Sequence, residues 1–410
     1  MASNELFDAY EPGFVSDPYP TFSELRERSP IFRSPEWGVT FFARHEDVSG
    51  ILKDRRFGRD VRQAVPPEEI DKEVFDRIYP PQYPNWTFYT RESFIDLEPP
   101  AHTRLRRLVQ HAFTRRASNT YRPRLEAAAA GLIHAALDKG GMEAIADYAT
   151  PIPLAMISDL MGIPAEDQPS LVEWSHAMVR VFDQACTPEE GQRAEQATID
   201  FAEYIKAQLE DRRRNGGEDL INALLDAEVE GDRLTEDEII ATAILTLNAG
   251  HEATVQAIGN GLLALARFPD QYQRLRDDPD LIGSAVDELL RFDTPLQMFE
   301  RWVLEDLEWK GVALKRGSKV GLLFGSANHD EAVFESPASL DLARDPNPHV
   351  SLGAGIHYCV GAPLAAVELQ VAFAEFAKRI PEFSVTSEEL PRVPSLIFRG
   401  VTRLELSLSA

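Results

Sequence analysis

Cys359 is the residue whose surroundings are best suited to chemistry. It lies in the segment GAGIHYCVGAPL, and a helix is predicted to begin at about Val360 to Leu364, just after the sulfur. Backbone N–H groups and the helix dipole at such an N-terminus favour a thiolate over a thiol. Gly353 and Gly355 permit tight turns with positive φ before it. The alternative interpretation is that Cys359 is a small buried apolar residue, the commonest environment of a lone cysteine.

A second candidate site lies within the longest predicted helix, residues 235–266. Thr235 and Glu238 form a T-x-x-E capping box at its start, and the helix is apolar on most sides, which predicts a buried position. Gly250 and the polar residues around it are costly inside such a helix. A glycine inside a helix and a polar run in a buried helix both lower stability, and finding the two together is typical of a functional site. The alternative interpretation is a structural kink at which polar side chains contact a neighbouring helix. The polar residues are Asn248, His251, Glu252 and Thr254.

The composition excludes several classes of protein. The 410 residues include 67 acidic and 42 basic side chains, a net charge of −25 that repels nucleic acid. The two cysteines, Cys186 and Cys359, are too few for a disulfide scaffold or for a zinc site built on several cysteines. The sequence shows no secretory signal and no apolar run of about 18 residues, so we expect a cytoplasmic protein without a membrane anchor.

The elements that must position these residues are mainly helices. Apolar spacing predicts helices over 102–117, 122–137, 152–161, 169–181 and 191–214, with strands after residue 293 and a hairpin near residues 31–45. The segment 59–100 is rich in proline and aromatic residues, and we expect an irregular substrate-access loop there, the alternative being a variable surface loop. Without a repeat or a low-complexity linker, the sequence predicts one domain over 1–410.

The loop around Cys359, residues 349–361, resembles the haem-binding loop F-G-x-G-x-H-x-C-x-G of bacterial members of the cytochrome P450 family. The resemblance implies a mainly α fold with small β-sheets, a long central helix over the haem, and Cys359 as the thiolate ligand of haem b. It also implies that His357 contacts a haem propionate. One departure is that Leu352 replaces the usual phenylalanine.

Other separated motifs agree with this family, and the resemblance covers essentially the whole chain. Glu288 and Arg291 form an E-x-x-R pair that, with Arg344, resembles the structural Glu-Arg-Arg triad of the family, although such a pair alone is usually a surface salt bridge. The resemblance also implies contacts to the haem propionates. Two of these come from residues four apart on one helix face, and a third comes from a residue in a predicted strand. The residues concerned are His102, Arg106 and Arg301.

The segment Ala249 to Thr254 resembles the oxygen-activation motif A-G-x-[DE]-T-T. The resemblance implies a groove for dioxygen at Gly250 and an acid for proton delivery at Glu252. Ala253 stands where threonine is usual, and Thr254 follows one residue later, rotated by about 100° around the helix. We therefore expect the Thr254 hydroxyl not to point where the usual hydroxyl points.

The helix period and the resemblance together predict which residues line a substrate pocket. The resemblance also predicts which arginines contact a redox partner. Core packing is the alternative for each pocket residue, and a solvated face is the alternative for the arginines. The predicted pocket residues are Phe94, Ile95, Leu245, Asn248, Ala249, Gln297, Phe299, Ile397 and Phe398. The arginines predicted to dock an acidic ferredoxin are Arg104, Arg107, Arg115 and Arg116.

The sequence thus predicts a monomeric haem-thiolate monooxygenase that inserts one oxygen atom of O2 into a small, mainly hydrophobic substrate. Because no flavin or iron–sulfur motif is present, electrons are expected from a ferredoxin and its reductase. Two alternatives stay open at this point. One is a peroxide-driven or substrate-assisted enzyme of the same fold, and the other is a haem sensor or carrier without turnover.

Overall fold

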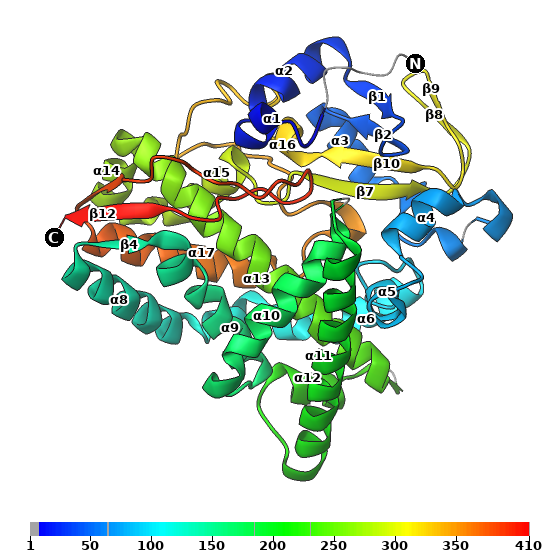
Figure 1. Cartoon of the computed structure of the whole chain (residues 1–410), viewed down its shortest axis with the longest axis horizontal. Coiled ribbons are helices and arrows are strands. Elements are labelled where there is room, and N and C mark those ends of the chain that lie inside the picture. Colours follow the sequence, from blue (N-terminus) through cyan, green and yellow to red (C-terminus); the bar gives the residue numbers. More distant parts are fainter. Residues whose placement is uncertain (1–7, 64, 184, 230, 410) are drawn as a thin grey trace.

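The computed structural model of the chain describes residues 8–63, 65–183, 185–229 and 231–409. Helices surround one long helix, α13 (Glu236–Arg267), as Figure 1 shows. Those before it are α1 (Pro12–Ser16), α2 (Tyr19–Arg28), α3 (His45–Lys53), α4 (Lys72–Ile78), α5 (Pro84–Arg91), α6 (Ala101–Val109), α7 (Arg115–Asn119), α8 (Arg122–Lys139), α9 (Pro151–Met161), α10 (Gln168–Val179), α11 (Pro188–Asn215) and α12 (Leu220–Asp226). Those after it are α14 (Pro269–Asp277), α15 (Ile282–Phe292), α16 (Phe324–Ala327) and α17 (Ala362–Arg379).

The strands form small sheets beside the helices. The largest has the order β1-β2-β10-β7-β3; β1 and β2 form the predicted hairpin, and β10 runs parallel to β2. In a second sheet β12 pairs with β11 and with β4. The strands are β1 (Ile31–Ser34), β2 (Val39–Phe42), β3 (Phe57–Gly58), β4 (Gly141–Glu143), β5 (Glu228–Val229), β6 (Asp232–Arg233), β7 (Met298–Val303), β8 (Leu307–Trp309), β9 (Val312–Leu314), β10 (Lys319–Leu323), β11 (Glu382–Val385) and β12 (Glu405–Ser409).

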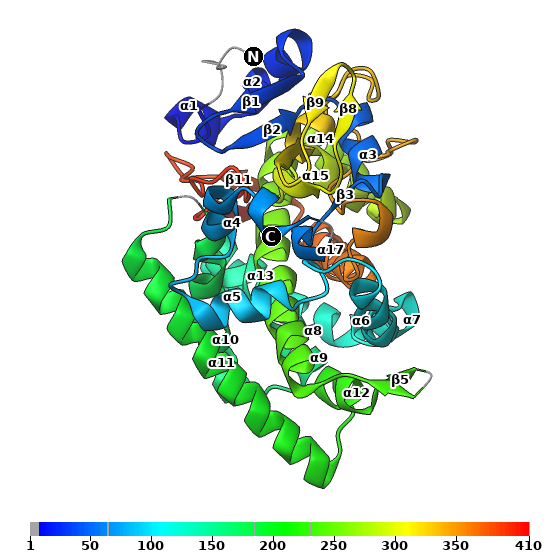
Figure 2. The ribbon, with the colours of Figure 1, turned by 90° about the vertical axis from the view of Figure 1, so that its right-hand side faces the viewer.

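Helix α13 runs through the middle of the molecule because it is apolar on most sides. The predicted capping box is confirmed: Thr235 Oγ1 accepts a hydrogen bond from Glu238 N, and the Glu238 carboxylate accepts one from Thr235 N. Helices α9, α10, α11, α15 and α17 pack against α13, which Figure 2 shows from the side. A helix in this position can present one face to a buried site while its other faces hold the core.

Two segments differ from the sequence-based expectations. The segment 59–100, expected to be irregular, contains α4 and α5 and short 3-10 turns. Pro84 occupies the first turn of α5, where a missing N–H costs no hydrogen bond, so this proline begins a helix instead of preventing one. The expected helix over 102–117 is interrupted, because Thr114 Oγ1 accepts a hydrogen bond from Ala117 N and caps the new helix α7.

The elements form a single, mainly helical domain. Its main hydrophobic core runs from Tyr83 in the sequence to Leu408 in β12, and therefore draws on both halves of the chain. Among the residues that the structure describes, no helix is long and apolar enough to span a bilayer.

Candidate active site

The Cys359 loop adopts the tight turns that its glycines predict. Gly353 and Gly355 both have φ of +70°, the left-handed region that other residues rarely adopt. A Cβ on Gly355 would lie 2.3 Å from the carbonyl oxygen of Leu52, so glycine also allows the loop to approach α3. The Cys359 N–H donates to Leu352 O at 3.0 Å, and α17 begins at Ala362, three residues after the cysteine. The sulfur therefore lies beside the N-terminus of a long helix, as predicted.

The Cys359 sulfur is half-buried, and its surroundings act on its charge in two directions. Burial raises the pKa of the thiol, whereas the N–H groups of Gly361 and Ala362 and the Arg106 guanidinium lower the pKa. The raising effect dominates in the chain alone. Coordination to a metal ion removes the proton of a thiol. Cys359 is therefore expected to be a thiolate when it is bound to a metal ion.

His102, Arg106 and His357 lie together on one side of this loop. Both ring nitrogens of His102 lack a hydrogen-bond partner among the described residues, although only 2% of the residue is exposed. Its ring lies 4.5 Å from that of His357, centroid to centroid. Arg106 Nη2 donates to the carbonyl oxygen of Tyr358 at 2.7 Å. Burial, together with His357 and Arg106, lowers the pKa of His102 to about 4, so its imidazole is neutral.

Arg301 on β7 is a buried cation without a matching anion. It is 2% exposed, its Nη1 donates to the carbonyl oxygen of its neighbour Glu300, and no carboxylate in the described chain lies within ion-pairing distance. Burial first, and then Arg59, lower the pKa of Arg301 to about 9. An unpaired buried guanidinium is costly, and a bound carboxylate would remove that cost. Arg301 and the unpartnered nitrogens of His102 therefore fit the two propionates of a haem held by Cys359.

Glu98 and Arg59 also belong to this site, and the sequence analysis did not single them out. Glu98 Oε1 lies 2.9 Å from His357 Nε2 and accepts a hydrogen bond from Arg59 N at 2.7 Å. Burial would raise the pKa of Glu98, but these hydrogen bonds lower it below its ordinary value. Arg59 pairs with Asp96 and lies 4.4 Å from the Phe299 ring.

One face of α13 is open in the middle of the molecule. Ala249 is exposed, and Leu245 and Ala253 are half-buried, although most other residues of this helix are buried. The helix period predicts this shared face. Asn248 lies beside it, with Nδ2 3.9 Å from Met178 Sδ and with Oδ1 unpartnered. Small side chains on an otherwise buried helix leave room for a cofactor and a substrate.

The polar part of α13 is arranged differently from the family motif. Thr254 is 5% exposed and therefore lies on a buried side, as its rotation from Ala253 predicts. Glu252 Oε1 lies 3.0 Å from His176 Nε2 on α10. Burial opposes the charge of Glu252, but His176 and His251 lower its pKa to about 2. At Gly250 a Cβ would lie 3.3 Å from Ile157 Cδ1, so this glycine also allows α9 to pack closely.

The remaining predicted pocket residues come from three segments with different environments. Gln297 N donates to Ile397 O, and Leu296 pairs with Phe398, which brings two of these segments together. Phe94 is buried in the main core, whereas Ile95, Phe299, Ile397 and Phe398 are half-buried. The Arg301 guanidinium lies 5.1 Å from the Phe299 ring.

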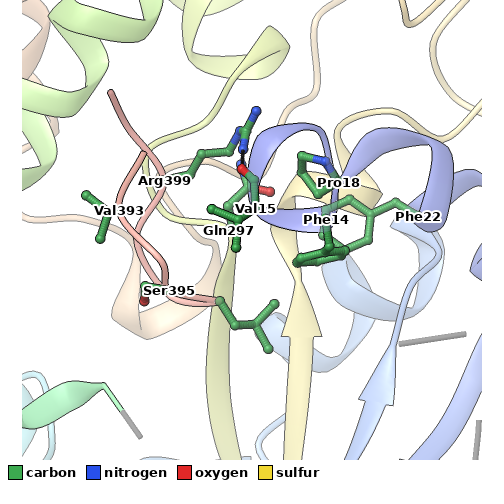
Figure 3. Close-up of a pocket in the computed structure, with 9 residues that line it drawn as sticks. Phe14, Val15, Pro18, Phe22, Gln297, Val393, Ser395 and Arg399 are labelled. Atoms are coloured by element: carbon green, nitrogen blue, oxygen red, sulfur yellow. Dashed lines mark hydrogen bonds between the residues drawn. The ribbon is translucent and has the colours of Figure 1, made fainter. Parts of the chain in front are cut away.

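Gln297 is not placed as the polar handle that the sequence suggested. Its Nε2 donates to Thr294 O at 2.8 Å, and its side chain lines a small cavity with Phe14, Phe22 and Arg399, as Figure 3 shows. This cavity lies beside α1 and α2, and no local sequence pattern predicted that these helices lie next to Gln297. Asn248 therefore remains the predicted polar handle beside the open face of α13.

Glu288, Arg291 and Arg344 lie in contact, as the spacing and the resemblance suggested. Arg291 donates to both carboxylate oxygens of Glu288, at 2.7 and 2.8 Å, and both residues are fully buried. Arg344 Nε donates to Glu288 Oε2 at 3.0 Å. The same carboxylate accepts hydrogen bonds from Asp341 N and Asn347 Nδ2. The surface-salt-bridge alternative is therefore wrong, and the trio holds the segment that leads to the Cys359 loop.

The arginine surface needs a correction at Arg104. Its guanidinium pairs with Asp232 on β6 at 2.5 Å and with Glu238 on α13 at 2.6 Å, so its charge is already compensated. The hydrogen bond from Arg104 is the main cause that lowers the pKa of Asp232, and Arg107 makes a smaller contribution, so Arg107 also lies near this acidic pair. Arg115 and Arg116 are exposed; burial raises the pKa of Tyr358, next to the cysteine, and Arg115 partly opposes that rise. The predicted docking surface is therefore reduced to the Arg115 and Arg116 side of the cysteine loop.

Comparisons with known proteins agree with this geometry. The sequence model of the Cytochrome P450 family matches residues 70–401. The chain is 35% identical to "Polyketide biosynthesis cytochrome P450 PksS" of Bacillus subtilis, covering 98% of this chain and 99% of that protein. It is also 35% identical to "Vitamin D(3) 25-hydroxylase" of Pseudonocardia autotrophica, covering 98% and 97%.

Solved structures give the same answer. P450BioI, in complex with an acyl carrier protein ligated to hexadec-9Z-enoic acid, superposes with a TM-score of 0.89 at 31% identity, covering 97% of this chain and 99% of that chain. The family match spans more than half of the chain, and the relatives are similar along their whole length. The chain therefore belongs to the cytochrome P450 family, as a monooxygenase with haem b as its cofactor.

Proposed function

We propose that this enzyme inserts one oxygen atom of O2 into a mid-sized, mainly hydrophobic substrate, with electrons from a ferredoxin and its reductase. The observation that carries the proposal is the open face of α13, where Leu245, Ala249 and Ala253 are accessible inside a buried helix. An apolar face with one polar handle, Asn248, suits a hydrophobic molecule that carries one or two oxygens.

The roles of the site residues follow from their chemistry. Cys359 holds the haem iron as a thiolate, and haem supplies the reductive activation of dioxygen when it is bound. Arg301, Arg106, His102 and His357 would hold the propionates, and Glu98 lies within hydrogen-bond distance of His357 beside them. Among the described residues Arg301 has no carboxylate partner and the His102 ring nitrogens have no hydrogen-bond partner, so binding a dicarboxylate would satisfy groups that are otherwise buried at a cost.

The relatives support a hydrophobic substrate class. By their names, one acts in polyketide biosynthesis and another is a hydroxylase of vitamin D(3), and P450BioI was solved with a fatty-acyl chain on its carrier protein. Vitamin D(3) and the hexadec-9Z-enoyl chain share a large apolar skeleton with few oxygens. We propose a substrate of this kind.

The decisive experiment compares electron sources. The haem-loaded enzyme is supplied with candidate apolar substrates and either NADH, reductase and ferredoxin or hydrogen peroxide alone. Product that needs the ferredoxin system supports the proposal. Product with peroxide alone favours the peroxide-driven alternative, and a substrate-induced spectral change without any product favours a sensor or carrier.

Ala253→Thr should raise the yield of product per NADH several-fold for substrates that lack a suitably placed oxygen. Ala253 provides no hydroxyl, and Thr254 is buried on another side of α13, so protons are expected to arrive through Glu252, water or a polar group of the substrate. The measurement is the ratio of product to NADH consumed. An unchanged ratio for every substrate, with coupling lost in Thr254→Ala, would show that Thr254 supplies the hydroxyl.

Reversing the charge of Arg115 and Arg116 together, to glutamate, should slow electron transfer from an acidic ferredoxin about tenfold at low ionic strength. Both residues are exposed, and Arg115 lies close enough to Tyr358 in the cysteine loop to affect its pKa. The effect should shrink as salt shortens the Debye length from about 10 Å at 0.1 M. Stopped-flow reduction measures it, and Arg33→Glu with Arg193→Glu is the matched control on other surfaces. Equal slowing in the control, or an effect independent of salt, would contradict docking at Arg115 and Arg116.

A further inference from the structure

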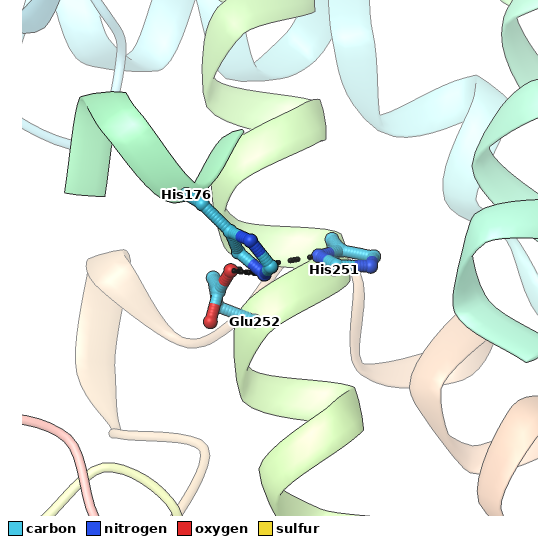
Figure 4. Close-up of side chains that lie close together, drawn as sticks. All are labelled: His176, His251 and Glu252. Carbon is cyan, nitrogen blue, oxygen red and sulfur yellow. Dashed lines mark ion pairs between the residues drawn. The ribbon is translucent and has the colours of Figure 1, made fainter. Parts of the chain in front are cut away.

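Three potential metal ligands meet between α10 and α13, away from the cysteine loop. His251 and Glu252 come from the middle of α13, and His176 reaches them from α10, as Figure 4 shows. Glu252 Oε1 lies 3.0 Å from His176 Nε2 and 3.6 Å from His251 Nδ1. The ligand atoms of the three residues all lie within 4.8 Å of one another. His251 is two residues from both Ala249 and Ala253, so it lies on the opposite side of the helix from the open face.

The cluster is unusual because its buried member has no hydrogen-bond partner. His251 is 1% exposed, and within the described chain neither of its ring nitrogens makes a hydrogen bond. At 3.6 Å its Nδ1 is too far from Glu252 Oε1 for one. A buried polar group without a partner is costly, so this arrangement calls for a ligand that the imidazole can bind.

We propose that His176, His251 and Glu252 form a binding site for a divalent transition-metal ion of the Zn²⁺ class. Two imidazoles and one carboxylate are ligands that Zn²⁺ accepts, and water completes such a site. Ligands at about 2.0–2.1 Å from a tetrahedral ion lie roughly 3.4 Å apart, and the observed 3.0 and 3.6 Å bracket that spacing. The two imidazole ligand atoms lie within 4.8 Å of each other, and a turn of His176, whose side chain is 57% exposed, brings its nitrogen closer to that of His251.

Such an ion strengthens the connection between two helices that already meet through the His176–Glu252 pair and the contact of Asn248 Nδ2 with Met178 Sδ. It links α10 to the centre of α13 and engages the Glu252 carboxylate, one residue before Ala253 on the open face. Because the two histidines come from positions far apart in the sequence, the site forms only in the folded protein. Bound metal should therefore protect both helix segments from amide hydrogen exchange, which is a readout independent of turnover.

The test uses the haem-loaded enzyme, freed of loosely bound metal with a chelator and titrated with Zn²⁺ in a calorimeter. The wild-type enzyme should bind one equivalent, and His176→Ala should weaken binding at least about tenfold, since loss of even an outer-shell partner costs roughly 10- to 100-fold. His134→Ala is the matched control, because His134 on α8 is highly exposed and pairs only with Asp138. Its Zn²⁺ affinity should equal that of the wild type.

Cu²⁺ as a paramagnetic probe identifies the ligands directly. Pulsed electron paramagnetic resonance should show two coordinated imidazoles in the wild type and one in either His176→Ala or His251→Ala. The ferrous carbon monoxide spectrum of each variant shows that it is folded, and the surface variant His176→Ala keeps the test valid if His251→Ala fails to fold. Undetectable Zn²⁺ binding by the wild type, or affinity unchanged in His176→Ala, would overturn the proposal.

Discussion

Cys359→Ala should abolish the red-shifted absorption band that the ferrous carbon monoxide complex of a thiolate-ligated haem shows. The sulfur lies at the N-terminus of α17 beside Arg106, and nothing else in the loop can replace a thiolate ligand. Product formation should fall to the background level in the same variant. The measurement is the difference spectrum of the reduced enzyme with and without carbon monoxide.

The second cysteine provides the control for this prediction. Cys186 precedes α11, and burial together with Glu190 raises the pKa of its thiol, so it lacks the surroundings that favour a thiolate. Cys186→Ala should therefore keep the full band. If the band survived in Cys359→Ala and disappeared in Cys186→Ala, the assignment of the haem ligand would be wrong.

Arg291→Met should lower the free energy of unfolding by about 3–5 kcal/mol, because it leaves the fully buried Glu288 carboxylate without its bidentate partner. Arg291 also donates to the carbonyl oxygens of Asn328 and Pro337. Asn328 in turn bonds Val350 N and Ser351 Oγ at the start of the cysteine loop. We therefore expect weaker haem retention as well, measured by urea unfolding and by the haem absorbance after mild heating.

A surface pair gives the matched control for the buried trio. Arg28 and Glu24 form an i,i+4 pair on α2, with the arginine side chain 65% exposed. Arg28→Met should change stability by less than about 1 kcal/mol, because solvent screens an exposed pair. If Arg291→Met were as mild as Arg28→Met, the Glu288 trio would not hold the loop.

Local patterns in the sequence were enough for the elements and for the linear motifs. The capping box of Thr235 and Glu238, the positive-φ glycines before Cys359 and the E-x-x-R spacing each depend on residues within a few positions of one another. When residues are three or four positions apart in the sequence, the helical period and backbone sterics alone determine whether they can form hydrogen bonds or lie on the same helix face. That is why these predictions agree with the structure.

Other features depended on neighbours that the sequence does not place. The prolines of 59–100 suggested an irregular loop, yet Pro84 starts a helix, because its effect depends on where the helix begins. The arginine run suggested a uniform surface, but Arg104 meets Asp232 and Glu238 from remote segments. Gln297 points into a cavity beside α1 and α2, which no local pattern indicated.

The sequence by itself thus determined the family, the candidate haem ligand and the buried central helix. Each of these depends on residue types only a few positions apart in the chain. Only the tertiary structure decided which charges are paired and which are not. His176 beside Glu252, Glu98 beside His357 and the unpaired Arg301 all arise where segments remote in sequence meet. The physical reason is that burial and the electrostatic partners of a side chain are set by packing between elements, and packing is not a property of any one segment.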